Sequence, residues 1–326
     1  MTINRRRLLG TTATALAASF NLPAFAQAWP ARPIHLISPY AAGGASDILT
    51  RLLGQYLSDK LGQSIIVENK AGAGTRIANE YVAHAAPDGY TILHAAAPVA
   101  IGEALYKKLP YDVHKDFAPI VSTAIAPLFL IVNADAPYKT LAEFIQYGKS
   151  KPKGLTFGSP GVGSAPHLTA ELFLRATGVK GITIQFRGDA PAYLELLAGR
   201  IDATLTAISA ALPHIQANKL RVLAVATEER TSVYPQAPTF REQGHPTIVG
   251  YGWYGLMAPT GTPAPIIARL NTETNAALAD AEIRKKVNAV GLQLRGGTPA
   301  EFGAFIDGET RKWAQIIKAA NIVVAD

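Results

Sequence analysis

Two short segments of the sequence combine glycines with a serine in a way that suits the binding of an anion by the backbone. They are 40–47 (YAAGGASD) and 158–167 (GSPGVGSAPH), and each stands between an apolar stretch and a stretch with helical spacing. The glycines permit close approach of a ligand, and Ser46 or Ser164 is expected to cap the helix that follows. Because free amides at a helix start carry partial positive charge, each segment could hold a carboxylate or phosphate without a cationic side chain.

A plainer alternative is that both segments are ordinary turns between a strand and a helix, with a serine that only caps. Their recurrence at comparable places in two halves of the chain favours the anion site. A third turn, 186–191 (FRGDAP), repeats the scheme with Asp189 as the expected cap. Its Arg187 either faces the ligand or is a solvated surface cation, and both interpretations stay open.

Other site chemistries find less support in the sequence. The run 161–163 (GVG) begins like a dinucleotide fingerprint, but Pro166 stands where the third glycine is required, and no GxxxxGK[ST] motif occurs. The seven histidines show neither HExxH nor another short metal-ligand spacing, so neither a metal site nor a cofactor is predicted. No GxSxG elbow accompanies Ser164 and His167, so no catalytic residues are predicted and an exported hydrolase is the weaker alternative.

The apolar patterns predict an α/β protein with two lobes. Expected strands at 34–38, 64–68 and 90–94 alternate with helices, as in a parallel doubly wound sheet. A second cycle, with strands at 155–159, 182–186 and 220–226, follows an apolar crossover at 120–132. The chain then returns to the first lobe through 251–258, whose Tyr251, Trp253 and Tyr254 either line a cleft or pack in the core. The expected division is a leader at 1–26, the first lobe at 27–127, the second lobe at 128–252 and the returning part of the first lobe at 253–326.

The leader has the order of regions that is typical of a signal peptide. Arg5, Arg6 and Arg7 precede an apolar stretch from 8 to 22, and the small residues Ala24 and Ala26 allow cleavage after Ala26, with Ala28 as the alternative. Both a Sec and a twin-arginine signal fit the paired arginines. A retained membrane helix is the weaker alternative because the stretch is short and contains polar residues. We therefore expect a periplasmic protein.

The charge and the cysteine content limit the classes of binding partner and of membrane attachment that the sequence supports. The chain has 31 basic and 24 acidic residues, and the three arginines of the leader reduce the mature balance to 28 − 24 = +4. Because the basic residues form no blocks, this net charge does not indicate nucleic-acid binding. A mild positive field is compatible with the binding of anionic solutes. The absence of cysteine excludes disulfides and a lipoprotein anchor. No later run is long enough to span a bilayer, so the mature protein is not expected to be embedded in a membrane.

The mature chain resembles the Bug (TctC-type) family, the periplasmic receptors of tripartite tricarboxylate transporters. The similarity extends over essentially all of it and rests on the order and spacing of several short motifs. They are 29–34 (WPARPI), 39–47 (PYAAGGASD), 61–63 (LGQ), 67–74 (VENKAGAG), 87–91 (PDGYT), 109–112 (LPYD), 116–119 (DFAP) and 157–164 (FGSPGVGS) followed by His167-Leu168.

The resemblance implies a type II periplasmic-binding fold that closes on a carboxylate held largely by backbone amides and ordered water. It also implies membrane permease subunits of the TctA/TctB kind as partners, and we expect a monomer. A periplasmic sensor that signals to another protein is the alternative. The expected ligand-contacting residues are Tyr40, Ala41, Ala42, Gly43, Gly44, Ser46, Asp47, Thr75, Ala97, Pro98, Ser159, Gly161, Val162, Gly163, Ser164, His167, Arg187 and Gly188.

The chain departs from the family pattern at a few places near the expected cleft. Thr75 stands where the family often has a further glycine, and Glu103 and Arg187 introduce charges that the family commonly lacks there. Thr75 is expected to alter selectivity, whereas Glu103 and Arg187 indicate either a ligand with an amino or amide group or only surface drift. The ligand classes that stay open are a dicarboxylate, a tricarboxylate, an aromatic acid and an acidic amino acid.

Overall fold

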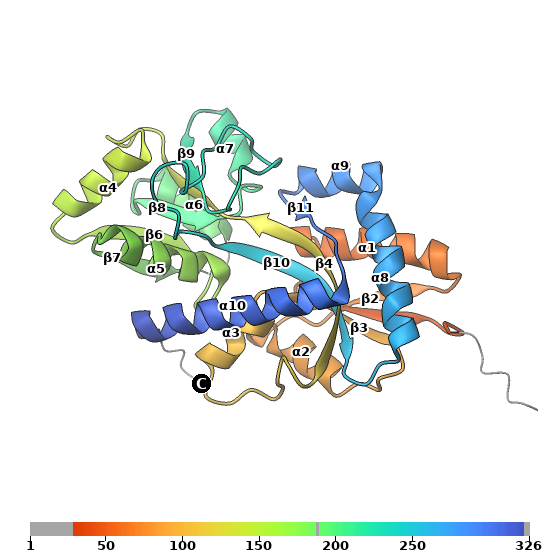
Figure 1. Cartoon of the computed structure of the whole chain (residues 1–326). Coiled ribbons are helices and arrows are strands. Elements are labelled where there is room, and N and C mark those ends of the chain that lie inside the picture. The colour runs from red at the N-terminus through yellow and green to blue at the C-terminus, as the bar shows by residue number, and fades with distance from the viewer. Residues whose placement is uncertain (1–28, 187–188, 323–326) are drawn as a thin grey trace, which may run out of the picture.

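The computed structural model describes residues 29–186 and 189–322, and it shows an α/β molecule of two lobes, each built on one β-sheet (Figure 1). The predicted signal peptide and cleavage site lie outside these residues, as do Arg187 and Gly188. None of the helices within the described ranges has the length and apolar character needed to cross a membrane.

The first sheet has six strands. In spatial order they are β11 (Gln293–Leu294), β4 (Phe117–Pro127), β10 (Tyr251–Pro259), β3 (Thr91–Ala96), β1 (Ile34–Ser38) and β2 (Ile65–Asn69). Strands β1, β2 and β3 are parallel, as the alternating pattern predicts. The expectation of an all-parallel sheet is wrong for the other half: β10 runs antiparallel to both β3 and β4 because it enters this sheet on its way back from the second lobe.

The second sheet has five strands. In spatial order they are β7 (Gly181–Gln185), β6 (Leu155–Ser159), β8 (Ala203–Thr206), β5 (Phe129–Asn133) and β9 (Leu220–Val225). Strand β6 is parallel to β7 and β8, whereas β5 is antiparallel to β8 and β9. The apolar segment 120–132, expected as a crossover between the lobes, does pass from the first sheet to the second, and it consists of most of β4, a one-residue break at Leu128 and most of β5.

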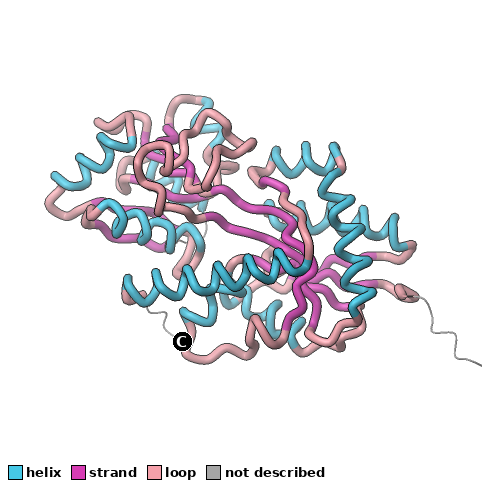
Figure 2. Tube along the Cα trace, in the orientation of Figure 1, coloured by secondary structure: helices cyan, strands magenta, loops and turns pink. Residues whose placement is uncertain are grey.

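Helices cover both faces of each sheet (Figure 2). They are α1 (Ala45–Leu61), α2 (Arg76–Ala83) preceded by the 3₁₀ turn η1 (Ala73–Thr75), α3 (Pro98–Leu105), α4 (Leu141–Ser150), α5 (Ala165–Thr177), α6 (Asp189–Leu197), α7 (Leu212–Gln216), α8 (Ala264–Ala279), α9 (Ala281–Ala289) and α10 (Pro299–Ala320). Neighbouring residues of β1 show the layering: Leu36 packs with α1 and α8, whereas Ile37 packs with α2 and α3. A strand that is apolar on both faces is typical of a sheet buried between helices.

Two strand passages connect the lobes, and they lie side by side. The chain leaves the first sheet through β4 and returns through β10, and Tyr251 at the start of β10 pairs with Pro127 at the end of β4. Strand β10 therefore starts two residues before the expected beginning of the returning part, at 253. Helix α10 adds a third link, because it packs on α3 and β4 and reaches α5, where Arg175 donates a hydrogen bond to the carbonyl of Ala319 (Figure 1).

Candidate ligand site between the lobes

A cavity of about 540 Å³ lies between the two lobes. The first lobe and the passages contribute Tyr40, Gly74, Thr75, Ala97, Pro98, Leu105, Tyr106, Ala126, Leu128, Gly252, Trp253 and Tyr254, and the second lobe contributes 160–166 and Ala207. The glycine-bearing loop before α5 thus forms one side of the cavity. The opposite side comes from the ends of β1 and β3, from η1 and from α3.

The structure brings only part of the predicted site to this cavity. The expected residues that line it are Tyr40, Thr75, Ala97, Pro98, Gly161, Val162, Gly163 and Ser164. The expected residues that do not line it are Ala41, Ala42, Gly43, Gly44, Ser46, Asp47, Ser159 and His167. Trp253 and Tyr254 line the cavity, and Trp253 is also packed in the core against Phe302 and Phe305.

The loop before α5 is fixed by its own side chains. Ser164 has an extended backbone (φ −68°, ψ 156°), and its hydroxyl accepts the N–H of His167 at 3.3 Å and donates to the carbonyl of Gly161 at 2.7 Å. The prediction that Ser164 caps this helix is therefore confirmed. Gly163 has a positive φ of 73°, and its N–H donates to Nδ1 of His167 at 3.0 Å.

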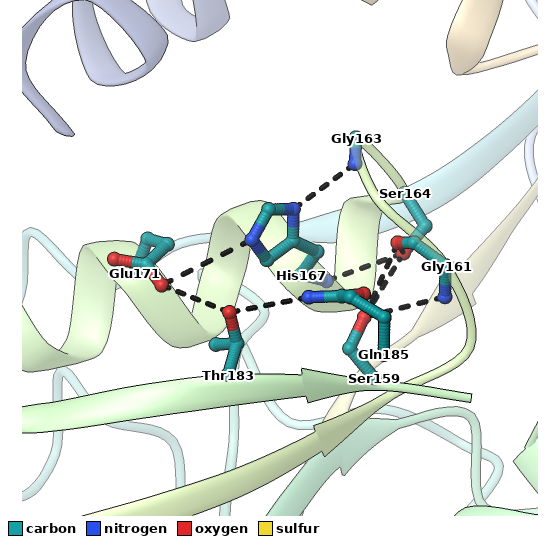
Figure 3. Close-up of polar contacts among 8 residues, drawn as sticks. All are labelled: Ser159, Gly161, Gly163, Ser164, His167, Glu171, Thr183 and Gln185. Carbon is teal, nitrogen blue, oxygen red and sulfur yellow. Dashed lines mark hydrogen bonds and ion pairs between the residues drawn. The ribbon is translucent and has the colours of Figure 1, made fainter. Parts of the chain in front are cut away.

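A line of polar contacts continues from His167 away from the loop (Figure 3). Since Nδ1 accepts a hydrogen bond, the ring hydrogen sits on Nε2, which lies 3.9 Å from Oε1 of Glu171. Glu171 accepts a hydrogen bond from Thr183 at 3.1 Å. Burial lowers the pKa of His167 and raises the pKa of Glu171. His167 is thus an uncharged side chain that stabilises the loop. Ser159 stabilises the same turn, because its hydroxyl lies 3.3 Å from the carbonyl oxygen of Gly161.

Two backbone donors of this loop have no acceptor in the part of the chain that the structure describes. They are the N–H groups of Val162 and of Ala165, the first residue of α5, and both residues line the cavity. Pro166, the second residue of α5, has no N–H. Donors left free at a helix start are an anion site when they face a space that a ligand can enter.

The loop before α1 is built on the same plan with different residues. Helix α1 begins at Ala45 with Gly44 as its N-cap, so the prediction that Ser46 caps this helix is wrong. Ser46 is the second helical residue, and its buried hydroxyl has no hydrogen-bond partner among the described residues. Gly44 is the N-cap instead. Glycine is well accepted at the N-cap position, and the backbone of Gly44 is extended, with a ψ of 171°.

Position by position, the two helix starts correspond. The pairs are Gly43 and Gly163, Gly44 and Ser164, Ala45 and Ala165, and Asp47 and His167. In both, the glycine N–H donates to the side chain four residues later, to Asp47 at 3.0 Å in the first loop and to His167 in the second.

Asp47 places a negative charge at the start of α1. Its side chain is buried and also accepts hydrogen bonds from Arg51 Nε at 2.9 Å and Asn69 Nδ2 at 2.8 Å. Burial alone would raise the pKa of Asp47, but the hydrogen bonds from Arg51, Gly43 and Asn69 outweigh it and lower the pKa to about 2. The start of α1 is thus neutralised by its own carboxylate, whereas the start of α5 carries a neutral imidazole.

The cavity wall is aromatic and uncharged. Of the described residues that line it, none has a charged side chain. The rings of Tyr40 and Tyr254 meet edge to face at 6.4 Å, and Tyr254 stacks on His94 with centroids 5.6 Å apart. Burial lowers the pKa of His94 to about 3, so this ring is neutral and adds no positive charge behind Tyr254. The lining residues therefore offer only uncharged donors, which are backbone amides, hydroxyl groups and the indole N–H of Trp253.

Two lobes of this topology around an uncharged cavity define a solute-binding protein, and comparison with known proteins gives the family. The model of the TctC family, described as "Tripartite tricarboxylate transporter family receptor", matches residues 49–322. The chain therefore belongs to the TctC family, which confirms the resemblance seen in the sequence. It is 35% identical to the protein BugT of Bordetella pertussis over 319 residues, which cover 97% of this chain and 98% of BugT.

Solved structures show the same fold. The chain is similar to Rpa4515 of R. palustris, solved with adipate, at a TM-score of 0.80 and 33% identity, covering 90% of this chain and 99% of that one. It is also similar to MatC of Rhodopseudomonas palustris, solved with bound malate, at a TM-score of 0.75 and 32% identity, covering 89% and 100%. The family and these neighbours are substrate-binding proteins, not enzymes, as the sequence predicts.

Proposed function

We propose that this protein is a periplasmic receptor that captures a small carboxylate in the cavity between its lobes and delivers it to membrane permease subunits of the TctA/TctB kind. The observation that carries the proposal is the pair of free N–H donors, on Val162 and Ala165, that border an aromatic and uncharged cavity. The adipate and malate in two similar proteins support a carboxylate as the ligand.

The physical basis is the replacement of water by fixed donors. A carboxylate that enters the cavity loses its hydration, and the amides at the start of α5 offer it hydrogen bonds without any change of conformation. In surroundings of low dielectric constant such charge-assisted bonds are stronger than in water. Because none of the lining residues that the structure describes has a cationic side chain, the site suits one or two carboxylates better than three, so a dicarboxylate or an aromatic acid fits better than a tricarboxylate.

The first experiment screens acids against the mature protein. Thermal unfolding is measured with adipate, malate, citrate, benzoate and glutamate, and with uncharged amides and sugars of similar size. A ligand at 100 times its Kd should stabilise the protein by about 2.7 kcal/mol. If the amides or sugars stabilise the protein and the acids do not, the carboxylate proposal fails.

A second experiment removes one of the free donors. Ala165→Pro deletes the N–H at the first position of α5, where a helix needs no hydrogen bond and where proline is well accepted after the extended Ser164. A hydrogen bond to a charged group contributes about 1.5–3 kcal/mol, so affinity for the bound acid should fall by about 10- to 100-fold in calorimetric titration.

The matched control is Ala281→Pro. It makes the same change at the first position of α9, after the extended Asp280, and Ala281 does not line the cavity. This variant should bind like the unchanged protein. Equal affinities for the two proline variants would show that the start of α5 does not hold the ligand.

A further inference from the structure

The end of the cavity opposite α5 contains a run of left-handed backbone. Ala73, Gly74 and Thr75 have φ values of 47°, 62° and 76°. A β-branched residue is strained in this region, because its side chain crowds the following carbonyl. Thr75 is only 3% exposed and lines the cavity. Strain of this kind persists where the surrounding structure holds it, and it is concentrated at functional sites.

Asn79, one turn further along α2, fixes the role of the Thr75 hydroxyl. Its amide nitrogen donates to Thr75 Oγ1 at 3.1 Å and to the hydroxyl of Tyr111 at 2.9 Å, and its oxygen has no partner among the described residues. In this orientation both N–H hydrogens of the amide are used, one on the Thr75 hydroxyl and one on the Tyr111 hydroxyl, and we assign the amide accordingly.

The hydroxyl of Thr75 thus accepts from Asn79 and keeps its own hydrogen to donate. Within the described residues, nothing accepts a hydrogen bond from it. We propose that Thr75 donates this hydrogen bond to the bound acid, at an oxygen other than those of the carboxylate held at the start of α5, and that Asn79 is its positioning residue. The ligand is then an acid with an oxygen acceptor at each end and an apolar middle against Tyr40, Tyr106 and Tyr254.

This inference rests on the proposed function, and the two fail in different ways. If no acid of the panel binds the unchanged protein, the proposed function itself is wrong. If acids bind, the question is whether a second oxygen group adds affinity through Thr75. Adipate is therefore compared with hexanoate, and malate with butyrate. Each pair has the same number of carbons; hexanoate lacks only the far carboxylate of adipate, whereas butyrate lacks both the far carboxylate and the hydroxyl of malate.

Three substitutions of Thr75 separate its hydroxyl from its shape. Thr75→Val keeps the branched side chain and removes the donor, Thr75→Ser keeps the donor, and Thr75→Gly removes the donor together with the backbone strain. Loss of a hydrogen bond to a charged group weakens binding by about tenfold or more. The valine and glycine variants should therefore bind adipate or malate at least about tenfold more weakly, by calorimetry, while the serine variant binds as before.

Binding of hexanoate and butyrate should change little in all three variants, because these acids have no second oxygen group. Should the valine variant unfold, the glycine variant still decides, since it is free of the strain at φ 76°. Unchanged affinity of either folded variant for adipate and malate overturns the inference.

Asn79→Asp tests the positioning role. At a pH high enough to ionise the introduced carboxyl, whose pKa burial raises, the carboxylate accepts the hydrogen of Thr75 and so withdraws the donor from the ligand. The preference for adipate over hexanoate, or malate over butyrate, should then disappear while hexanoate and butyrate bind as before. A change that affects both acids of a pair equally would mean that Asn79 has a general structural role only, and the positioning part of the inference would be wrong.

Discussion

The loop before α1 and the loop before α5 share a plan, yet they differ in the residue at the third helical position and in their relation to the cavity. The first has Asp47 there and contributes only Tyr40 to the cavity wall, whereas the second has His167 and lines the wall with 160–166. Both side chains accept the N–H of a glycine with positive φ. The difference is charge: an acid compensates the positive end of its own helix, and a neutral imidazole leaves that end available to a ligand.

The largest expected contrast follows from adding a methyl group to the matching glycines. Gly163 has φ +73°, and a Cβ there would lie 2.3 Å from Leu105 Cδ1, whereas Gly43 has φ +91° and no atom within 4 Å. Left-handed strain costs about 1–2 kcal/mol and overpacking about 1–3 kcal/mol. Urea denaturation should therefore show a loss of about 2–5 kcal/mol for Gly163→Ala and of about 1–2 kcal/mol for Gly43→Ala.

Truncating Leu105 separates the cost of overpacking from the cost of left-handed backbone strain. In a Leu105→Ala background, Gly163→Ala should cost no more than Gly43→Ala, because only the strain is left. Equal losses in the unchanged background would show that Leu105 moves aside freely and that the two loops are equally tolerant.

The acceptors of the two loops should titrate in different pH ranges. The pKa of Asp47 is about 2 in the folded protein and 3.8 ordinarily, so the unfolded chain binds the proton more tightly and the free energy of unfolding falls as the pH decreases from about 4 to about 2. The shift corresponds to about 2 kcal/mol. The pKa of His167 is lowered from 6.5, so its contribution begins to fall as the pH drops below that value.

Amide signals report each loop separately. In a pH titration followed by NMR, the Gly163 N–H should shift at a higher pH than the Gly43 N–H, because protonation of His167 removes its acceptor first. Asp47→Asn should abolish the change at Gly43 and leave that at Gly163. A Gly43 signal that changes before the Gly163 signal would contradict this order.

A smaller effect, on ligand affinity, is expected when His167 at the third position of α5 is replaced by aspartate, the residue at the third position of α1. His167→Asp keeps an acceptor for the Gly163 N–H but adds a negative charge near the free amides of Val162 and Ala165. Repulsion across a partly solvated distance of several ångströms amounts to about 1–2 kcal/mol, so affinity for a bound acid should fall by about tenfold in calorimetry. His167→Asn, which adds an acceptor without charge, should bind nearly as the unchanged protein does.

Local patterns in the sequence were enough for the parallel strands β1 to β3 and for the cap at Ser164. Those strands are short apolar runs followed by glycine turns, and a serine directly before Ala-Pro has few other local roles. The cap of α1 was misplaced because Gly44 and Ser46 are both good caps, and the choice depends on Asp47 reaching Gly43, Arg51 and Asn69 at once. Contacts to a residue as distant as Asn69 have no signature in a local pattern.

The far side of the cavity was harder to predict for the same reason. Leu105 and Tyr106 are ordinary residues at the end of a short apolar helix, and only the approach of the second lobe makes them part of the wall. The contact of Asn79 with Tyr111 joins residues that are far apart in the chain. Thr75 was singled out for its position after a glycine turn, but its positive φ and its hydrogen bond from Asn79 became evident only in three dimensions.

The adjacent passages β4 and β10 have a consequence for kinetics. Because Tyr251 pairs with Pro127, any change in the angle between the sheets must bend this hydrogen-bonded ribbon as one unit and shift the contact of α10 with α5 at the same time. We therefore expect one dominant hinge motion. Fluorophore pairs placed anywhere across the lobes would then relax with a common time constant, whichever rim of the cleft carries them.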